Sequence, residues 1–422
     1  MINIAYARIG KKEGIFDALM KSHWKFIVSV CIAEILTMGG TMFFPALLPD
    51  FQSEWHLSNT EAGWINGIFF GGYAAFAPIL VSLTDRIDPR RIYLFSAALG
   101  AFSMLGFGLL AQGTVTAMIF RFCAGISLAG TFMPGLKALS DHITGENQSR
   151  AIAFYTSSYG IGTAASVFFS GLLVIWLHWR QAAVLLSLGY IGAVLIFALT
   201  VEPKMPASPL RKHPLSSFNF RGALRNRSAV GYISGYAVHC WELFGFRSWM
   251  VAFLAFSMTL QGGNGDYLSP QNIATLIVLA GVPASILGNE IAHRWDRRRA
   301  VAIFMLVSGI FGCFLGFCVH LPYTIVAGLC ILYGIAVMLD SGSLTAGIVA
   351  AAYDEERGKT LALYTFAGFC MAFVSPLAFG FILDMAGSGI FGWGLAYASL
   401  GAVSMSGPLW LRLFRNTNPK NV

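Results

Sequence analysis

The sequence predicts an all-α membrane protein of twelve transmembrane helices, arranged as two related six-helix bundles around a central cavity. Three observations lead to this prediction. Of the 422 residues, 56% are hydrophobic and 11% are charged, whereas a soluble domain carries about 25% charged residues. Apolar runs of about 20 residues, the length that crosses a bilayer, recur along the chain. A charged turn between two such runs occurs twice, about half a chain apart.

The repeated turn shows that the chain is a duplication. In both copies an Arg is followed two residues later by Asp and then by a pair of Arg, in the segments 84–91 and 293–299. Asp85 corresponds to His293, an offset of 208 residues, and the same offset relates Glu34 to Glu242. Repeats of six helices place a binding site between the two halves, near the middle of the membrane.

The spans divide the chain into five parts. These are a basic leader (1–25), a first bundle (26–200), a polar linker (201–227), a second bundle (228–411) and a tail (412–422). The twelve spans are expected at residues 26–48, 61–83, 92–112, 115–137, 149–176, 180–200, 228–257, 270–292, 300–319, 321–350, 358–383 and 389–411.

The distribution of Lys and Arg sets the orientation. If the leader is cytoplasmic, the segments on that side hold all but three of the 28 Lys and Arg residues. Arg180 lies on the other side, and Arg121 and Arg247 lie within spans. The positive-inside rule therefore predicts a protein of the plasma (bacterial inner) membrane with both termini in the cytoplasm.

Composition argues against several other functions. No patch of Lys and Arg interleaves with aromatic residues, so nucleic acid is not an expected partner. The seven Cys residues lie in apolar runs without a CxxC pair, so neither disulfides nor a metal site is expected. No GxxxxGK[ST] segment occurs, which argues against an ATP-driven pump. We expect no cofactor and no enzymatic activity, because neighbouring residues such as His239 and Cys240 diverge by about 100° on a helix.

Five charged residues fall well inside predicted spans: Glu34, Arg121, Glu242, Arg247 and Asp340. A charge near the bilayer centre costs about 2.5–3.5 kcal/mol on insertion scales, so such residues are usually functional. The three acids are candidates for proton coupling, because a low-dielectric medium favours the neutral form of a carboxylic acid. A static bridge between Glu and Arg that ties helices together is the alternative.

Arg247 is the best candidate for holding an anionic solute, since a guanidinium binds a carboxylate through two parallel hydrogen bonds. An internal pair with Asp340 is the alternative. His239 shares a helix face with Glu242 and is a candidate for contacting the solute or relaying a proton. Metal binding and plain packing are its alternatives. The aromatic residues Trp241, Tyr236 and Phe43 are candidates for the cavity wall, with packing as the alternative for each.

Two motifs carry a resemblance to a known family. The turn Asp85-Arg86-x-x-x-Arg90-Arg91 and the segment Arg121-Phe122-x-x-Gly125 resemble signatures of the major facilitator superfamily, over essentially the whole chain. Val81 and Asp88 stand where that family usually has Gly, and the fifth span lacks the Gly-Pro pair typical of drug/proton antiporters. The resemblance implies a monomeric transporter whose first, fourth, seventh and tenth helices line the cavity.

The same resemblance assigns two further roles. It implies that Arg121 is a coupling or gating residue paired with an acid; snorkelling of its side chain to the headgroups is the alternative. It also implies that the charged turns form a conformational gate, which docks against the neighbouring half in one state. The alternative is that their charges only set the orientation of the helices in the membrane. The gate residues are Asp85, Arg86, Arg90, Arg91, Arg294 and Asp296.

Together these features predict a proton-coupled secondary active transporter. Two basic and three acidic residues suit a small anionic or zwitterionic organic solute, taken up with protons by alternating access. A proton-driven efflux antiporter for amphipathic or cationic compounds is the first alternative, and a divalent-metal transporter is a weaker one.

Overall fold

The computed structural model describes residues 24–143, 146–204, 220–262 and 269–415. All regular structure in these ranges is helical. Most of the predicted leader, the middle of the predicted linker and the end of the predicted tail lie outside the described residues, so the predictions for them stay predictions.

The first bundle begins with a helix over residues 24–37. Two short helices and five long ones follow: α2 (Phe43–Ala46), α3 (Leu48–Trp55), α4 (Asn59–Leu83), α5 (Pro89–Leu110), α6 (Thr114–His142), α7 (Glu146–Val174) and α8 (Trp179–Thr200).

A short helix, α9 (Arg221–Arg225), precedes the second bundle. The bundle itself contains α10 (Arg227–Leu260), α11 (Pro270–Arg294), α12 (Arg297–Leu315), η2 (Gly316–His320), α13 (Tyr323–Met338), α14 (Ser341–Ala351), η3 (Asp354–Glu356), α15 (Arg357–Ala386), α16 (Ile390–Ser404) and α17 (Gly407–Leu413).

The predicted spans match these helices closely, except where a span is broken. Among the described residues, ten stretches of helix are long and apolar enough to cross a membrane. The first and last predicted spans are interrupted, at residues 38–42 and 405–406, so each of them contains more than one helix. The tenth span is divided between α13 and α14 at Leu339 and Asp340.

The break in the first span follows from its sequence. Gly39 and Gly40 are poor helix formers. Pro45 lacks an N–H group and its ring clashes with the carbonyl four residues earlier, which is that of Thr41. The helix therefore ends at Thr37, and the carbonyl groups of the break need other partners.

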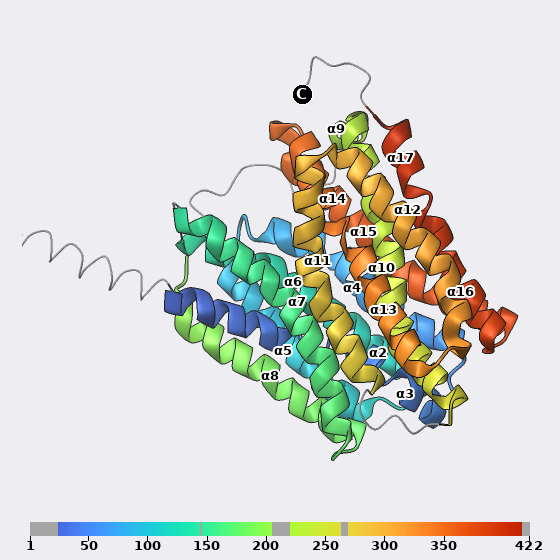
Figure 1. Cartoon of the computed structure of the whole chain (residues 1–422). Coiled ribbons are helices and arrows are strands. Elements are labelled where there is room, and N and C mark those ends of the chain that lie inside the picture. Colours follow the sequence, from blue (N-terminus) through green and yellow to red (C-terminus); the bar gives the residue numbers. More distant parts are fainter. Residues whose placement is uncertain (1–23, 144–145, 205–219, 263–268, 416–422) are drawn as a thin grey trace, which may run out of the picture.

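The two bundles meet along two pairs of helices. α4 of the first bundle packs against α15 of the second, and α7 packs against α11. In Figure 1, α5, α6 and α8 form one arm and α10, α12 and α16 form the other, and the arms diverge from the region around α2 and α3. We call the region around α3 and the first turn of α4 the far end. The ends that carry Arg86 and Arg298 are called the basic end.

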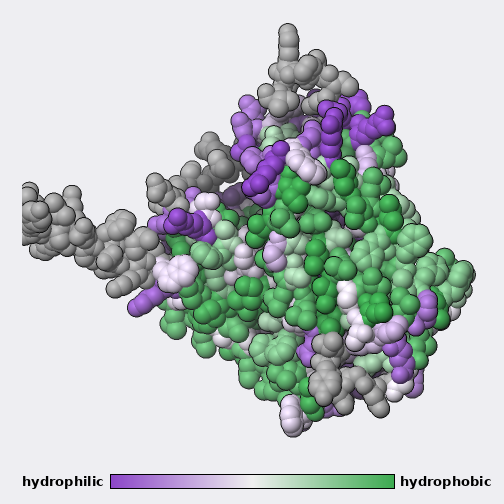
Figure 2. Space-filling model, viewed as in Figure 1, coloured by the Kyte–Doolittle hydropathy of each residue, from purple (hydrophilic) through white to green (hydrophobic). Residues whose placement is uncertain are grey.

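The outer surface is apolar over most of its height. Figure 2 shows a broad hydrophobic band with hydrophilic residues gathered beyond it. Large apolar side chains on the outer helices are exposed, among them Phe95, Leu199 and Phe314. A surface of this kind matches a lipid solvent, and the chain is a multi-pass membrane protein.

Candidate functional site

Aromatic side chains join the two bundles midway along their length. The rings of Phe70 (α4) and Phe244 (α10) lie 4.4 Å apart between centroids. Tyr73 (α4) stacks on Phe369 (α15) at 3.9 Å. All four side chains are buried, so the meeting surface of the bundles is closed by rings at this level.

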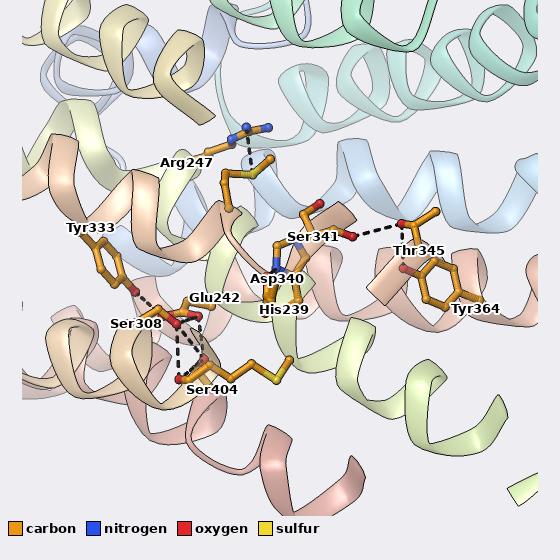
Figure 3. A network of polar contacts seen from close by, with 12 residues as sticks. His239, Glu242, Arg247, Ser308, Tyr333, Asp340, Ser341, Thr345, Tyr364 and Ser404 are labelled. Carbon is orange, nitrogen blue, oxygen red and sulfur yellow. Dashed lines mark hydrogen bonds and ion pairs between the residues drawn. The ribbon is translucent and has the colours of Figure 1, made fainter. Parts of the chain in front are cut away.

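Arg247 lies one turn further along α10 than Phe244. Its side chain is 8% exposed, and its Nη2 is 3.9 Å from the sulfur of Met338. Among the described residues, no carboxylate lies within 4 Å of this guanidinium. Figure 3 shows it directed away from the other polar residues of the second bundle. A buried cation without a partner is expensive, so an anion bound here would be strongly stabilised.

Glu242 is held inside the second bundle by three hydroxyl groups (Figure 3). Ser308 of α12 and Ser404 of α16 donate to its Oε2 at 2.9 and 2.6 Å. Tyr333 of α13 donates to its Oε1 at 3.0 Å. The carboxyl group is 1% exposed and points into its own bundle.

Asp340 and His239 form a second buried pair. Nδ1 of His239 is 2.7 Å from Oδ1 of Asp340, and neither atom has a well-directed hydrogen bond among the described residues. Asp340 stands at the break between α13 and α14. Tyr236 lies beside the pair, 6.0 Å from the His239 ring, and stacks on Tyr364 at 3.9 Å. The alternative pair of Asp340 with Arg247 does not form.

Glu34 occupies the corresponding position in the first bundle, but its surroundings differ. It is fully buried, and Tyr155 of α7 donates to its Oε2 at 2.8 Å. The hydroxyl of Tyr155 also lies 3.2 and 3.1 Å from the carbonyl oxygens of Thr131 and Phe132. Oε1 of Glu34 has no hydrogen-bond partner among the described residues.

Arg121 braces the break in the first span. Its Nη1 donates to the carbonyl oxygens of Gly40 and Thr41 at 3.2 and 3.0 Å, two groups of the break that accept no regular α-helical hydrogen bond. Its guanidinium carbon lies 4.4 Å from the ring centre of Phe69. The side chain is 4% exposed, so it does not snorkel. In the described part of the chain no acid pairs with it.

The aromatic candidates have different positions. Phe43 packs in the first bundle near the far end, with ring centres 6.0 and 5.9 Å from those of Phe51 and Phe107. Trp241 is half-buried and its indole nitrogen has no partner among the described residues. Phe43 therefore belongs to the packing of its bundle, whereas Trp241 remains a candidate for contact with a solute.

In the first charged turn, Asp88 accepts from the backbone of Arg90 at 2.9 Å and caps α5. Arg90 itself donates to the carbonyl of Ala198 at 2.7 Å, inside the first bundle. Asp85 is exposed and makes no ion pair with another described residue. Arg86 and Arg91 are both exposed, and Arg86 has an interaction partner.

The second charged turn is also tied to its own bundle. Asp296 caps α12 by accepting from the backbone of Arg299 at 2.8 Å. Arg294 pairs with Glu290 at 2.8 Å on the surface of α11. Arg298 donates to the carbonyl of Leu411 at 2.8 Å. The gating role assigned to both turns stays a prediction, because these contacts describe one state only.

The structure places the candidate residues in separate surroundings. The contacts of Glu34 and Glu242 each lie within one bundle, and neither carboxylate lies within 4 Å of the Arg247 guanidinium. Sequence reasoning also missed the hydroxyl partners of Glu242, which are Ser308, Tyr333 and Ser404. Ser and Tyr are ordinary in apolar helices, so the sequence marked the acid, by its place inside a span and by the 208-residue repeat, but not the hydroxyl groups around it.

Comparison with known proteins identifies the class of protein to which this architecture belongs. The sequence profile of the Major Facilitator Superfamily matches residues 30–338, well over half of the chain. The chain belongs to this superfamily of membrane transporters.

Individual relatives are more distant. An uncharacterized MFS-type transporter of Bacillus subtilis, YwoD, is 26% identical over 44% of this chain and 40% of its own length. The putative niacin/nicotinamide transporter NiaP of the same organism is 28% identical over 37% of this chain and 38% of its own. The probable L-galactonate transporter of Escherichia coli is 23% identical over 85% and 82%. The chain spans less than half the length of the first two.

Solved structures share the fold. A bacterial homologue of the human lysosomal transporter Spinster, in an inward-facing and unoccupied conformation, superposes with a TM-score of 0.71 at 17% identity, covering 93% of this chain and 95% of its own. A mutant form of the nucleoside transporter NupG gives a TM-score of 0.75 at 12% identity, covering 93% and 100%. These likenesses establish the fold of two six-helix bundles.

Proposed function

We propose that the protein is a proton-coupled secondary active transporter that takes up a small anionic or zwitterionic organic solute by symport. The observation that carries the proposal is Arg247, a buried guanidinium beside the ring contacts that join the bundles, with no carboxylate within 4 Å among the described residues. A carboxylate of the solute would supply the missing anion and accept two hydrogen bonds.

The names of several relatives support an organic acid. They are called transporters of niacin/nicotinamide, benzoate and L-galactonate, and niacin, benzoate and galactonate each carry one carboxylate. The structure favours metal transport less, because the positive charge of Arg247 repels a cation.

Alternating access is supported by the way the bundles meet. Their contacts include the far end, where Gln271 of α11 donates to the carbonyl of Ala46 at 3.2 Å, and the middle, where Asn66 donates to the carbonyl of Ser248 at 3.5 Å. Towards the basic end the arms diverge (Figure 1). We infer that this is the state open to the basic end, which we place in the cytoplasm with both termini, and that the protein works as a monomer.

Proton coupling rests on the buried acids. Neither Glu34 nor Glu242 has a cation within 4 Å among the described residues, so neither is part of a static bridge to Arg. Their partners are hydroxyl groups instead, one for Glu34 and three for Glu242. A hydroxyl group donates to a carboxylate and accepts from a carboxylic acid, so each acid can keep a partner when it gains a proton.

A binding screen tests the anion site directly. Purified protein is heated with a panel of monocarboxylates, amino acids, organic cations and divalent metals, because a bound ligand raises the unfolding temperature by mass action. We expect a carboxylate to stabilise the protein and Arg247→Ala to remove the shift. Arg412→Ala, which deletes an exposed Arg at the end of the second bundle, is the control and should keep it. Stabilisation by cations alone, or a shift that persists in Arg247→Ala, would exclude the proposal.

Proton movement separates symport from antiport. Vesicles with a pH dye in the lumen are prepared without a gradient, and the solute found in the screen is added outside. Symport carries protons in with the solute and acidifies the lumen, whereas antiport makes it alkaline. Protein-free vesicles correct for passive entry of the free acid. An alkaline response would favour the efflux alternative, to which the aromatic residues of α10 are also suited.

A further inference from the structure

Asp384 joins the two bundles at the far end. It lies in the last turn of α15, in the second bundle, and binds the first two residues of α4, in the first bundle. Its Oδ1 accepts from the backbone N–H and the side-chain amide of Asn59 at 3.0 and 2.9 Å. Its Oδ2 accepts from the backbone N–H and the hydroxyl of Thr60 at 2.8 and 2.6 Å. One carboxylate thus accepts four hydrogen bonds from the other half of the molecule.

These contacts complete the N-terminus of α4. The first N–H groups of a helix have no partner within the helix. Ser58 accepts from the third of them, that of Glu61, at 3.2 Å, and Asp384 accepts from the first two. The carboxylate also lies at the positive end of the helix dipole, where a negative charge is stabilised.

The backbones of the two helices are close enough to make this possible. A side chain at Gly63 or Gly67 of α4 would collide with the carbonyl groups of Pro376 and Phe373, and one at Gly380 would collide with that of Asn59. Small residues of this kind let membrane helices approach closely. Gly380 is one turn before Asp384, so the close approach delivers the carboxylate to α4.

We propose that Asp384 is a latch of the transport cycle that holds the far end closed. The latch rests on the alternating access proposed above. When the far end opens, α4 and α15 separate there and all four hydrogen bonds break together, so the carboxylate stabilises only the state that is open to the basic end. Interactions that exist in one state alone bias the equilibrium between states.

Hydrogen–deuterium exchange of the intact protein tests this latch without a solute or a proton gradient. In Asp384→Asn we expect exchange of the first turn of α4 to become about two- to fivefold faster, the range for a carboxylate at a helix N-terminus. The latch further requires the turn at 84–91 to exchange more slowly, since the population shifts towards closure of the basic end. Asp354→Asn, an exposed acid at the other end of the same span that pairs with Arg357, is the control and should change neither.

The two ends distinguish a latch from a plain helix cap. Faster exchange at α4 with no change at 84–91 would show a cap only and overturn the proposal, as would no change at either end. Thr60→Val removes one of the four hydrogen bonds from the α4 side. It should change the exchange rates at both ends in the same directions as Asp384→Asn, but by smaller factors. If Asp384→Asn does not fold, this variant decides alone. Failure of the binding screen would refute the anion site and leave these exchange results standing.

Discussion

The two halves of the molecule place a Glu at the same position of the repeat and surround it differently. Glu242 lies within the unbroken helix α10 and accepts from three hydroxyl groups. Glu34 lies three residues before its helix ends and accepts from one, with one oxygen unpartnered among the described residues. Hydroxyl donors stabilise a carboxylate anion. The comparison indicates that Glu242 fixes four helices of its bundle; for the proposed proton coupling we expect Glu34 to be the acid that exchanges a proton.

The largest expected effect is on stability. Glu242→Ala leaves Tyr333 without its acceptor and frees two serines, Ser308 and Ser404, which can both turn to the carbonyl of Met305, at 3.4 and 3.2 Å. We expect the free energy of unfolding to fall by about 3 kcal/mol, given about 1–3 kcal/mol for each unsatisfied buried group. Glu34→Ala should cost about 1 kcal/mol, because Tyr155 can turn to two nearby carbonyls.

Unfolding of both variants is followed in the same detergent by heating and by denaturant. Thr156→Ala removes an exposed hydroxyl that bonds only to its own helix and should stay within about 0.5 kcal/mol of the parent protein. If Glu34→Ala proves the more damaging of the two, the roles assigned to the two acids are reversed.

The next effect concerns coupling. Glu34→Gln removes the proton site and should reduce accumulation driven by a pH gradient at least about tenfold, within the usual range of coupling between two ligands, while exchange of labelled for unlabelled solute continues. Glu242→Gln should reduce accumulation less, because three hydroxyl groups tie the side chain of Glu242 to its own bundle. Both assays use the same reconstituted vesicles. Normal accumulation by Glu34→Gln would remove this residue from the mechanism.

A smaller effect is expected from the tyrosines. Tyr155→Phe takes away the hydroxyl that donates to Glu34, whereas Tyr333→Phe takes away one of three that donate to Glu242. Loss of a donor is worth about 1 kcal/mol. The pH at which transport is half-maximal should therefore rise by about half a unit to one unit in Tyr155→Phe and stay unchanged in Tyr333→Phe. An equal shift in both variants would show that the two acids titrate alike.

Much of this fold is readable from the sequence, because the bilayer imposes a length and a polarity on each span. The charged turns and the pair Glu34/Glu242 also revealed the repeat. The sequence did not reveal that Asp340 pairs with His239 rather than with Arg247, since a pairing across helices depends on how they rotate about their axes. Nor did it mark Asp384, because an acid at the end of a span looks like any surface charge until α4 is placed beside it.

The break in the first span is another difference between the halves, and it gives the smallest predicted effect. Position 39 is Gly in the first half, and the equivalent position, 208 residues later, is Arg247 in an unbroken helix. Ser166 of α7 braces the break: its hydroxyl accepts from the backbone N–H of Met42 at 2.9 Å and donates to the carbonyl of Gly39 at 2.8 Å.

Ser166→Ala leaves those two backbone groups unpaired and should lower the free energy of unfolding by about 1 kcal/mol. The equivalent residue of the second half is Val374, exposed on α15, as expected where no break needs a partner. Ser170→Ala, one turn further along α7, removes a buried hydroxyl that bonds only to its own helix and should cost less. Equal losses of unfolding free energy in the two serine variants would mean that Ser166 of α7 does not stabilise the break. Arg121 of α6 would then stabilise it alone.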